Sequence, residues 1–350
     1  MIMMKVCLKT VGKRIIKPIP LSVYRLLVKK EVMGFVYHTV SDEPLFHVKH
    51  LFPYKTPQMF EADLIHLKKN FNLMSSSELL EYRSSKTKFG PHSTILTFDD
   101  GYSECFSVAR PLLLKHEIPC VFFITTDFID NQKMYYRNKI SLCIEKISTS
   151  ANPEISAFFS DINDVFGLSI NSPESFIQWI KTLNHSSEDI IDEICKILRV
   201  NIKQYMMAHK PYMSSEEIKL LSSDGFTIGA HSKTHRKLYL LPNQEEIEEE
   251  IVSSCKEIME LTGEDRVPFA FPVSREDIDH DFLKSLISKY PFIHLFYDSG
   301  GLKKEKDFVI NRVPIDDPSL VLPGKSNIPV ILRDAYQGYL MNKIRNMLRS

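Results

Sequence analysis

The sequence predicts an α/β protein built on a barrel of parallel strands. Short apolar segments alternate with helical patterns along most of the chain, and several are continuous apolar runs without polar alternation. Such runs are typical of strands that are covered on both faces, as in parallel sheets. Seven of these segments favour a barrel, and they are residues 33–38, 94–98, 120–125, 226–230, 269–271, 293–297 and 308–313.

Two helices between these strands carry clear end signals. Ser214 and Glu217 form the pattern of a capping box, and Gly225 stands where a helix-terminating glycine belongs. Asn243 is the expected cap of the second helix, which opens with an acidic run over residues 245–250. We interpret that run as a solvated helix face rather than a metal or partner site.

Nearly 90 residues separate the third predicted strand from the helix at Ser214, and they do not fit a simple alternation of strand and helix. Isoleucines and leucines at 190, 191, 194, 197 and 198 follow the spacing of one buried helix face. We therefore predict an α-helical insertion at about residues 130–213. The expected organisation is a basic arm (1–30), the barrel with its insertion (31–330) and a C-terminal helix (331–350).

Composition narrows the classes of partner and compartment. The 350 residues hold 44 basic and 44 acidic side chains, and this balance argues against nucleic acid as a partner. The six cysteines are scattered without a C-x-x-C pair, which suits free thiols in a reducing compartment. With no membrane-spanning run and no secretory signal pattern, we expect a cytoplasmic protein.

The first 30 residues concentrate positive charge, with eight basic residues and no acidic one. Apolar residues between 21 and 28 allow an amphipathic helix that lies on an anionic membrane surface, at the inner face of the membrane. The alternative is an ordinary helix that covers the end of the barrel.

The most informative segment is the strand that ends in Asp99, Asp100 and Gly101. It places two carboxylates at the C-terminal end of a strand, where α/β barrels assemble their active sites. Alone, this tripeptide is also a common turn. A second group follows another strand, where His231 and His235 are spaced so that a helical turn would point both at one metal ion. Two histidines and a carboxylate suit zinc, cobalt, nickel or ferrous iron.

These motifs resemble those of the polysaccharide deacetylase family, also called the NodB-homology or carbohydrate esterase 4 family. Residues 97–101 (TFDDG) match its first motif, residues 231–235 (HSKTH) its second, and residues 269–272 (FAFP) resemble its third. The resemblance runs from about residue 33 to 315, interrupted by the insertion. Two departures lie in the third motif, where Ala270 replaces a common arginine and Ser274 replaces a glycine.

The resemblance implies a distorted (β/α)7-type barrel and metal-dependent hydrolysis of N-acetyl groups on amino sugars. It assigns Asp100, His231 and His235 as ligands of one divalent ion, with zinc as the first expectation. Asp99 resembles the general base, and the backbone N–H of Tyr102 is expected to hold the oxyanion. Further candidates for the substrate site are Phe271, Pro272 and Arg312.

The general acid is less directly marked, because the family's C-terminal Leu-x-x-His motif is absent after Arg312. Residues 35–40 (FVYHTV) instead resemble the start of the subgroup that deacetylates poly-N-acetylglucosamine, which implies that His38 is the acid. The alternative is a structural histidine. Arg312 or Arg275 could supply the charge that orients Asp99, or either could form a surface ion pair.

Together these observations predict a deacetylase that acts on an N-acetylated glycan or a lipid-linked sugar precursor. Two alternatives stay open. The motifs also serve O-deacetylation, and the departures from the family pattern allow a metal- and sugar-binding pseudoenzyme.

Overall fold

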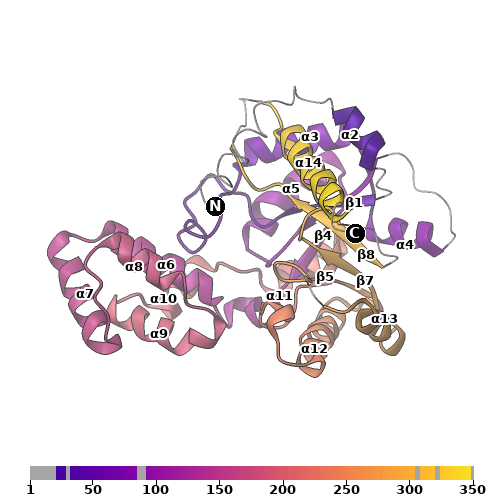
Figure 1. The fold of residues 1–350 in the computed structure, drawn as a ribbon. Helices are drawn as coiled ribbons and strands as arrows, with labels where there is room; N and C mark the ends of the chain where they lie inside the picture. Colours follow the sequence, from indigo (N-terminus) through magenta and orange to yellow (C-terminus); the bar gives the residue numbers. More distant parts are fainter. Residues whose placement is uncertain are drawn as a thin grey trace.

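Seven parallel strands close into a ring at the centre of the structure, which is a computed structural model (Figure 1). The structure describes residues 21–28, 32–84, 92–276, 278–303, 308–319 and 324–347. The ring closes where the first strand pairs with both the second strand and the last strand of the ring. This confirms the predicted barrel and the position of each predicted strand. The ring consists of β1 (Val32–Tyr37), β3 (Ser93–Phe98), β4 (Cys120–Ile124), β5 (Thr227–Ala230), β6 (Val267–Ala270), β7 (Ile293–Asp298) and β8 (Val309–Pro314). The additional β2 (Asn72–Leu73) pairs with the start of β3 and was not predicted, because two residues are too few to show a period.

The barrel interior is apolar over most of its length and polar at one end. A buried cluster that includes Ile95, Val121, Leu295 and Ile310 fills the part nearer the start of the strands. Successive side chains of a strand alternate between its two faces, so every second residue continues an inward row. By this alternation Asp99 follows Ile95 on the same face, which brings polar groups to the carboxyl end of the barrel.

Helices cover the outside of the barrel and bury a second, larger apolar cluster against it (Figure 1). The predicted capping box at Ser214 and Glu217 and the predicted cap at Asn243 are both present. The covering helices are α3 (Pro57–Asn70), α4 (Ser76–Ser84), α5 (Arg110–His116), α11 (Ser215–Ser223), α12 (Gln244–Thr262) and α13 (His280–Lys289).

A group of helices between β4 and α11 projects to one side of the barrel (Figure 1). Ile191 and Ile194 are fully buried in its core, as the periodicity predicts, whereas Ile190 is exposed. Trp179 packs its ring against Phe166 and Phe176. The group, called the helical lobe below, contains α6 (Tyr136–Thr149), α7 (Asn152–Phe166), α8 (Pro173–Ile180), α9 (Glu188–Ile197) and α10 (Ile202–His209).

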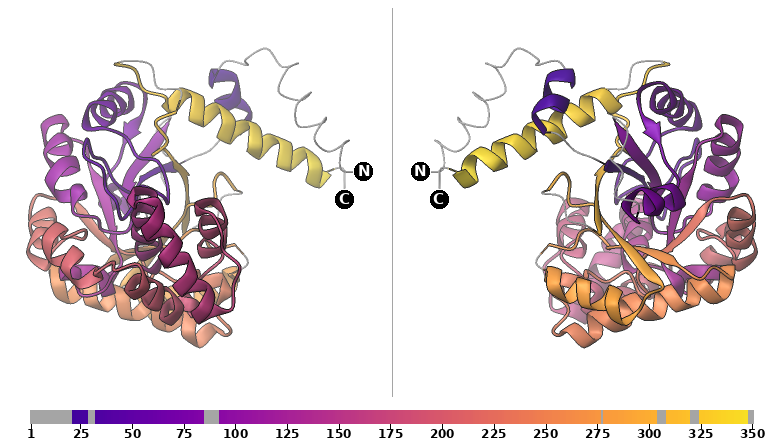
Figure 2. Two further views of the ribbon diagram at one scale, coloured as in Figure 1. Left: turned by 90° about the vertical axis from the view of Figure 1, so that its left-hand side faces the viewer. Right: turned by 90° about the vertical axis from the view of Figure 1, so that its right-hand side faces the viewer.

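The described part of the basic arm is α2 (Leu21–Val28), which lies beside α14 (Ile328–Met347) (Figure 2). The rings of Tyr24 and Tyr336 stack with centroids 6.4 Å apart, and the Gln337 amide donates a 2.7 Å hydrogen bond to the Tyr24 hydroxyl. This packing places α2 against α14, and the alternative of a helix that covers the end of the barrel stays a prediction. Residues 1–20 and 29–31 lie outside the described part, so membrane contact by the arm stays a prediction. Among the described helices, none combines the length and apolar character that a membrane span requires.

We predict that Gly34→Ala destabilises the barrel. A Cβ atom at Gly34 would lie 2.7 Å from Cγ of the buried Arg312, so the substitution forces the arginine to move. Overpacking of this kind costs about 1–3 kcal/mol of unfolding free energy. Urea unfolding measures the loss, and Gly338→Ala in α14 is the control, because a Cβ atom there meets no atom within 4 Å. Equal stability of the two variants would contradict the close packing of Arg312 on β1.

Candidate functional site

The end of β3 presents two carboxylates in different directions. The Asp99 N–H donates to the Tyr37 carbonyl at 2.9 Å, which continues the pairing of β3 with β1 and keeps Asp99 in the inward row. The next two residues leave the strand with left-handed backbone, with φ of +70° at Asp100 and +78° at Gly101. Aspartate is one of the few non-glycine residues that adopt this conformation readily, and glycine adopts it without strain. This turn aims Asp100 away from Asp99.

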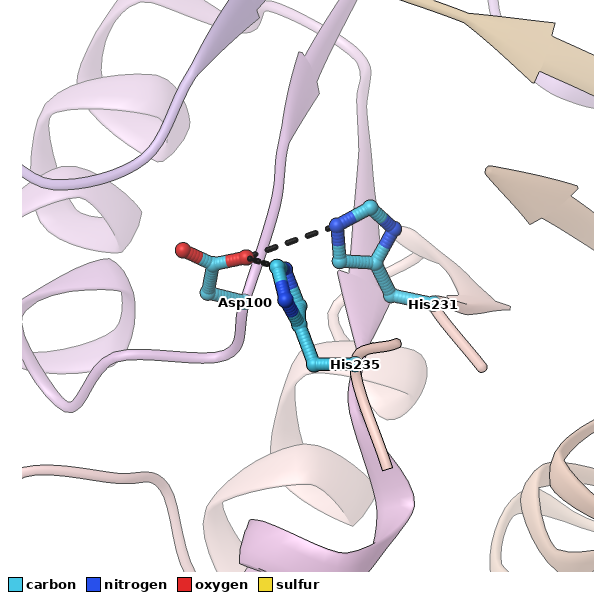
Figure 3. A group of neighbouring side chains, drawn as sticks. All are labelled: Asp100, His231 and His235. Atoms are coloured by element: carbon cyan, nitrogen blue, oxygen red, sulfur yellow. Dashed lines mark hydrogen bonds and ion pairs between the residues drawn. The ribbon is translucent and has the colours of Figure 1, made fainter. Parts of the chain in front are cut away.

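Asp100 meets two histidines that follow β5 (Figure 3). Nε2 of His235 lies 2.9 Å from Asp100 Oδ1, and Nε2 of His231 lies 3.4 Å from the same oxygen. One ligand atom from each of the three residues lies within 4.8 Å of the others, and all three residues are buried. The structure thus brings together the three predicted metal ligands.

The histidines converge on a loop and not on the helical turn that the spacing suggested. Ser232 and His235 both have left-handed backbone, with φ of +63° and +61°, so no helical turn forms. Glu250 of α12 holds the loop by accepting the N–H groups of Lys233 and Thr234 at 3.0 Å and the Thr234 hydroxyl at 2.5 Å. Glu250 is buried, which corrects the interpretation of the whole acidic run as a solvated face. No helical turn positions the two histidines. The loop that carries them is held instead by the Glu250 carboxylate.

The triad has the donor set of a divalent metal site. The Nδ1 atom of His231 lies 2.9 Å from the Ala270 carbonyl and can only donate to it, which leaves Nε2 free as a ligand atom. Burial alone raises the pKa of Asp100, but the charge of His235 and the hydrogen bonds from both histidines outweigh it and hold the pKa well below its usual range. An ionised carboxylate and two imidazoles in a buried cluster fit a divalent ion.

Arg312 holds Asp99 from inside the barrel. Its two terminal nitrogens donate to the two Asp99 oxygens at 2.6 and 2.7 Å, and they also donate to the hydroxyls of Thr97 and Ser299. Arg312 is completely buried, so it is neither a surface ion pair nor exposed to a substrate. Arg275 instead lies beside Asp298, with its backbone N–H donating to that carboxylate at 3.2 Å. The structure therefore pairs Asp99 with Arg312 and not with Arg275.

His38 directly follows β1 and is held by a carboxylate that lies two residues beyond β8. Asp316 accepts the His38 backbone N–H at 2.8 Å and lies 2.9 Å from its Nδ1 atom. Burial lowers the pKa of His38, but the charge and hydrogen bond of Asp316, with smaller contributions from Asp100 and Asp99, raise it to about 10. The imidazole therefore stays protonated near neutral pH, with Nδ1 occupied and Nε2 able to donate a proton.

Tyr102 sits at the junction of the barrel and the helical lobe. Its ring stacks on Tyr212 at 5.6 Å, and its hydroxyl accepts a hydrogen bond from the Asn138 amide at 3.1 Å. Two backbone hydrogen bonds flank Tyr102: the Ser103 N–H donates to the Pro211 carbonyl, and the Met213 N–H donates to the Gly101 carbonyl. The Tyr102 N–H itself has no acceptor in the part of the chain described.

Phe271 and Pro272, at the end of β6, are both buried. Phe271 is fully buried and stacks on Phe296 with ring centroids 5.3 Å apart, and it meets Phe269 edge to face. Pro272 is also buried. Phe271 belongs to the core between the barrel and its helices, and substrate contact by these two residues stays a prediction.

Three supporting residues were not predicted from the sequence, namely Glu250, Asp316 and Ser299. Asp316 carries a signal that could have found it, because it follows the predicted strand 308–313 as Asp99 follows its own strand. Glu250 could not be distinguished from the other acidic residues of its run, and Ser299 lies in a segment without a recognisable motif. Their roles depend on neighbours that are distant in the sequence.

Comparisons with known proteins agree with this geometry. The sequence model described as polysaccharide deacetylase matches residues 86–150 and 181–288, which contain the aspartate pair and the histidine pair. The structure of the Streptococcus pyogenes deacetylase PplD in complex with acetate is similar, with 13% identity, a TM-score of 0.53, and coverage of 88% of this chain and 98% of that chain. IcaB from Ammonifex degensii is similar with 15% identity, a TM-score of 0.52, and coverage of 88% and 97%. No curated protein sequence matches the chain.

We predict that Glu250→Gln weakens divalent metal binding by about 10- to 100-fold, as loss of a group that supports a ligand commonly does. The amide cannot accept all three hydrogen bonds that fix residues 233–234, so the two histidines lose their common orientation. Titration of the metal-free protein with zinc measures the change. Glu249→Gln is the matched control, because Glu249 is the exposed neighbour on the same helix. If both variants bind zinc as the wild type does, the loop does not depend on Glu250.

Proposed function

Because the chain belongs to the polysaccharide deacetylase family of carbohydrate esterase 4 hydrolases, we propose that it removes N-acetyl groups from an amino sugar in a glycan or glycan precursor. The observation that carries this proposal is that three groups of side chains lie together at one end of the barrel. These are the triad of Asp100, His231 and His235, the Asp99–Arg312 pair and the His38–Asp316 pair. Amide hydrolysis needs all three, because it requires an electrophilic centre, a base and an acid.

Asp100, His231 and His235 are the residues that would hold one divalent ion, and we propose zinc because it prefers this nitrogen and oxygen donor set. Cobalt, nickel or ferrous iron would accept the same ligands. When bound, such an ion polarises an acyl carbonyl and lowers the pKa of water toward neutrality.

Asp99 is the proposed general base. Its Oδ2 atom lies 3.8 Å from Nε2 of His231, so it borders the triad without taking part in its shortest contacts. Arg312 occupies one lone pair on each carboxylate oxygen and fixes the plane of the group. A second lone pair remains to accept the proton of the attacking water.

His38 is the proposed general acid. Asp316 holds its Nδ1 atom and keeps the ring charged, so Nε2 carries the proton that the departing amine needs. The free N–H of Tyr102, which directly follows Gly101, is the proposed donor to the oxyanion of the tetrahedral intermediate. These roles divide the site between groups that bind the ion and groups that move protons.

The retained acid and base favour an enzyme over a sugar-binding pseudoenzyme, since a binding protein needs neither group. Acetate is the product that the proposal requires, and the similar Streptococcus pyogenes deacetylase PplD was solved in complex with acetate. The same groups would also serve an O-acetyl ester, which is therefore a separate arm of the test.

The proposal predicts release of acetate from N-acetylglucosamine oligomers by the zinc-loaded full chain. Asp99→Asn should lower kcat by about 100-fold or more while zinc binding persists, because the base is lost and the triad is intact. His231→Ala should lose both activity and zinc. Acetate assays and metal analysis measure these outcomes. Zinc at full occupancy without acetate release from N-acetyl or O-acetyl sugars would overturn the proposal and favour the pseudoenzyme.

The pH dependence of the reaction should depend on Asp316. The acid must be protonated, so activity falls as pH rises through the pKa of His38, which Asp316 raises to about 10. Asp316→Asn removes the raising charge and leaves the lowering effect of burial, so the alkaline limb should move down by about one pH unit or more. Profiles of kcat/KM against pH measure this shift. Asp317→Asn is the control at an exposed neighbour, and equal profiles for both variants would exclude His38 as the titrating acid.

A further inference from the structure

A small cavity of about 270 Å³ is built by segments that are far apart in the sequence. His50 and Leu51 come from the loop between β1 and α3, and Arg137 comes from the start of α6. Lys181 follows α8, and Lys237 follows the histidine loop. Two of these segments belong to the helical lobe, so the lobe forms part of the cavity wall.

The cavity borders the candidate active site on two sides. Phe52, the residue after Leu51, packs its ring against His38 with centroids 4.8 Å apart. On the other side, the ring of the lining residue Tyr136 contacts Tyr135 at 4.8 Å, and Tyr135 contacts His235 at 4.4 Å. Phe52 and Tyr135 thus connect neighbours of the cavity lining to His38 and His235.

The cavity is lined by positive charge without a matching carboxylate. Arg137, Lys181 and Lys237 line it, and none of them forms an ion pair with any residue that the structure describes. The fourth basic group, His50, is already paired with Glu145 at 2.8 Å. Among the residues that the structure describes, no aspartate or glutamate lines the cavity. Three like charges around one small space repel one another, and an anion between them would relieve that repulsion.

The larger groove of the helical lobe lacks this character. It is lined by Asp130 and Asp192 as well as by basic residues, and its Lys139 is paired with both Glu188 and Asp192. The basic residues of the groove are thus partly neutralised by acidic neighbours. Arg137, Lys181 and Lys237 around the small cavity have no such partner among the described residues.

We propose that this cavity binds an anionic oxygen group, a phosphate or a carboxylate, that the substrate carries next to its acetamido sugar. An arginine fork and two lysine ammonium groups suit such oxygens. The inference rests on the proposed function and narrows its substrate to a negatively charged N-acetyl amino sugar. It also gives the helical lobe a role, since Arg137 and Lys181 are two of the three unpaired cations.

A binding experiment tests the cavity without the reaction. In the His231→Ala background, which removes the metal centre as a competing anion site, calorimetric titration uses inorganic phosphate and, separately, glucuronate. Trp179 is the single tryptophan of the chain and lies two residues before Lys181. Its fluorescence therefore gives a second measure of binding near the cavity. The triple variant Arg137→Gln, Lys181→Gln, Lys237→Gln should weaken binding by at least about 10-fold.

The matched control is Arg199→Gln, Lys203→Gln, Lys210→Gln, which removes the same charge from exposed residues of the same lobe. The control should bind both probes as the parent does. Equal loss in the two triple variants would show general charge attraction and overturn the inference, as would failure of the parent to bind either probe. The stronger of the two probes identifies phosphate or carboxylate as the preferred group.

Kinetics then connect the cavity to the substrate. With the zinc-loaded full chain, the cavity triple variant should raise KM by at least about 10-fold for N-acetylglucosamine 1-phosphate or for a disaccharide of glucuronate and N-acetylglucosamine. Its kcat, and its KM for neutral N-acetylglucosamine trimer, should stay close to wild type. An equal change for neutral and anionic substrates would overturn the inference. If the wild type releases acetate from none of them, the proposed function fails, while the binding result still decides the cavity.

Discussion

The buried ion pair between Arg312 and Asp99 is the interaction on which the site depends. Removing two charges from water is costly unless each hydrogen-bonding position is matched, and here the pairing is bidentate with both partners almost completely buried. Thr97 and Ser299 accept further hydrogen bonds from the two terminal nitrogens, whereas the buried Nε atom of Arg312 has no partner among the described residues. Gly34 leaves the space for the arginine stem. One side chain of β8 thereby ties together β1, β3 and the end of β7.

The other functional groups follow the same rule, since each is held by a partner from a different element. The Ala270 carbonyl at the end of β6 orients His231, Asp316 after β8 orients His38, and Glu250 of α12 fixes the loop between the histidines. None of these contacts is local in the sequence. The geometry of the site therefore exists only when the barrel is closed, and closure brings His38 and Asp99 to the same end of the barrel.

The helical lobe is connected to this end by aromatic rings. Tyr212 stacks on Tyr102 at 5.6 Å and on Phe128 at 4.9 Å, and Tyr135 continues the series to His235. The Tyr212 hydroxyl accepts the Tyr135 N–H and donates to the Asn138 side chain, so the series is also fixed by hydrogen bonds. The lobe is thus anchored beside the residues that the reaction would use.

The sequence by itself determined the barrel and the chemistry-bearing residues, because both depend on short-range patterns. Continuous apolar runs mark buried parallel strands, and Asp99, Asp100, His231 and His235 stand directly at strand ends. The tertiary structure alone decided that Arg312 and not Arg275 holds Asp99, since the partner of each arginine is distant in the sequence. It also decided that Phe271 belongs to the core and that Glu250 supports the histidine loop. Which face a residue presents, and which distant partner it meets, is set by closure of the ring and not by sequence spacing.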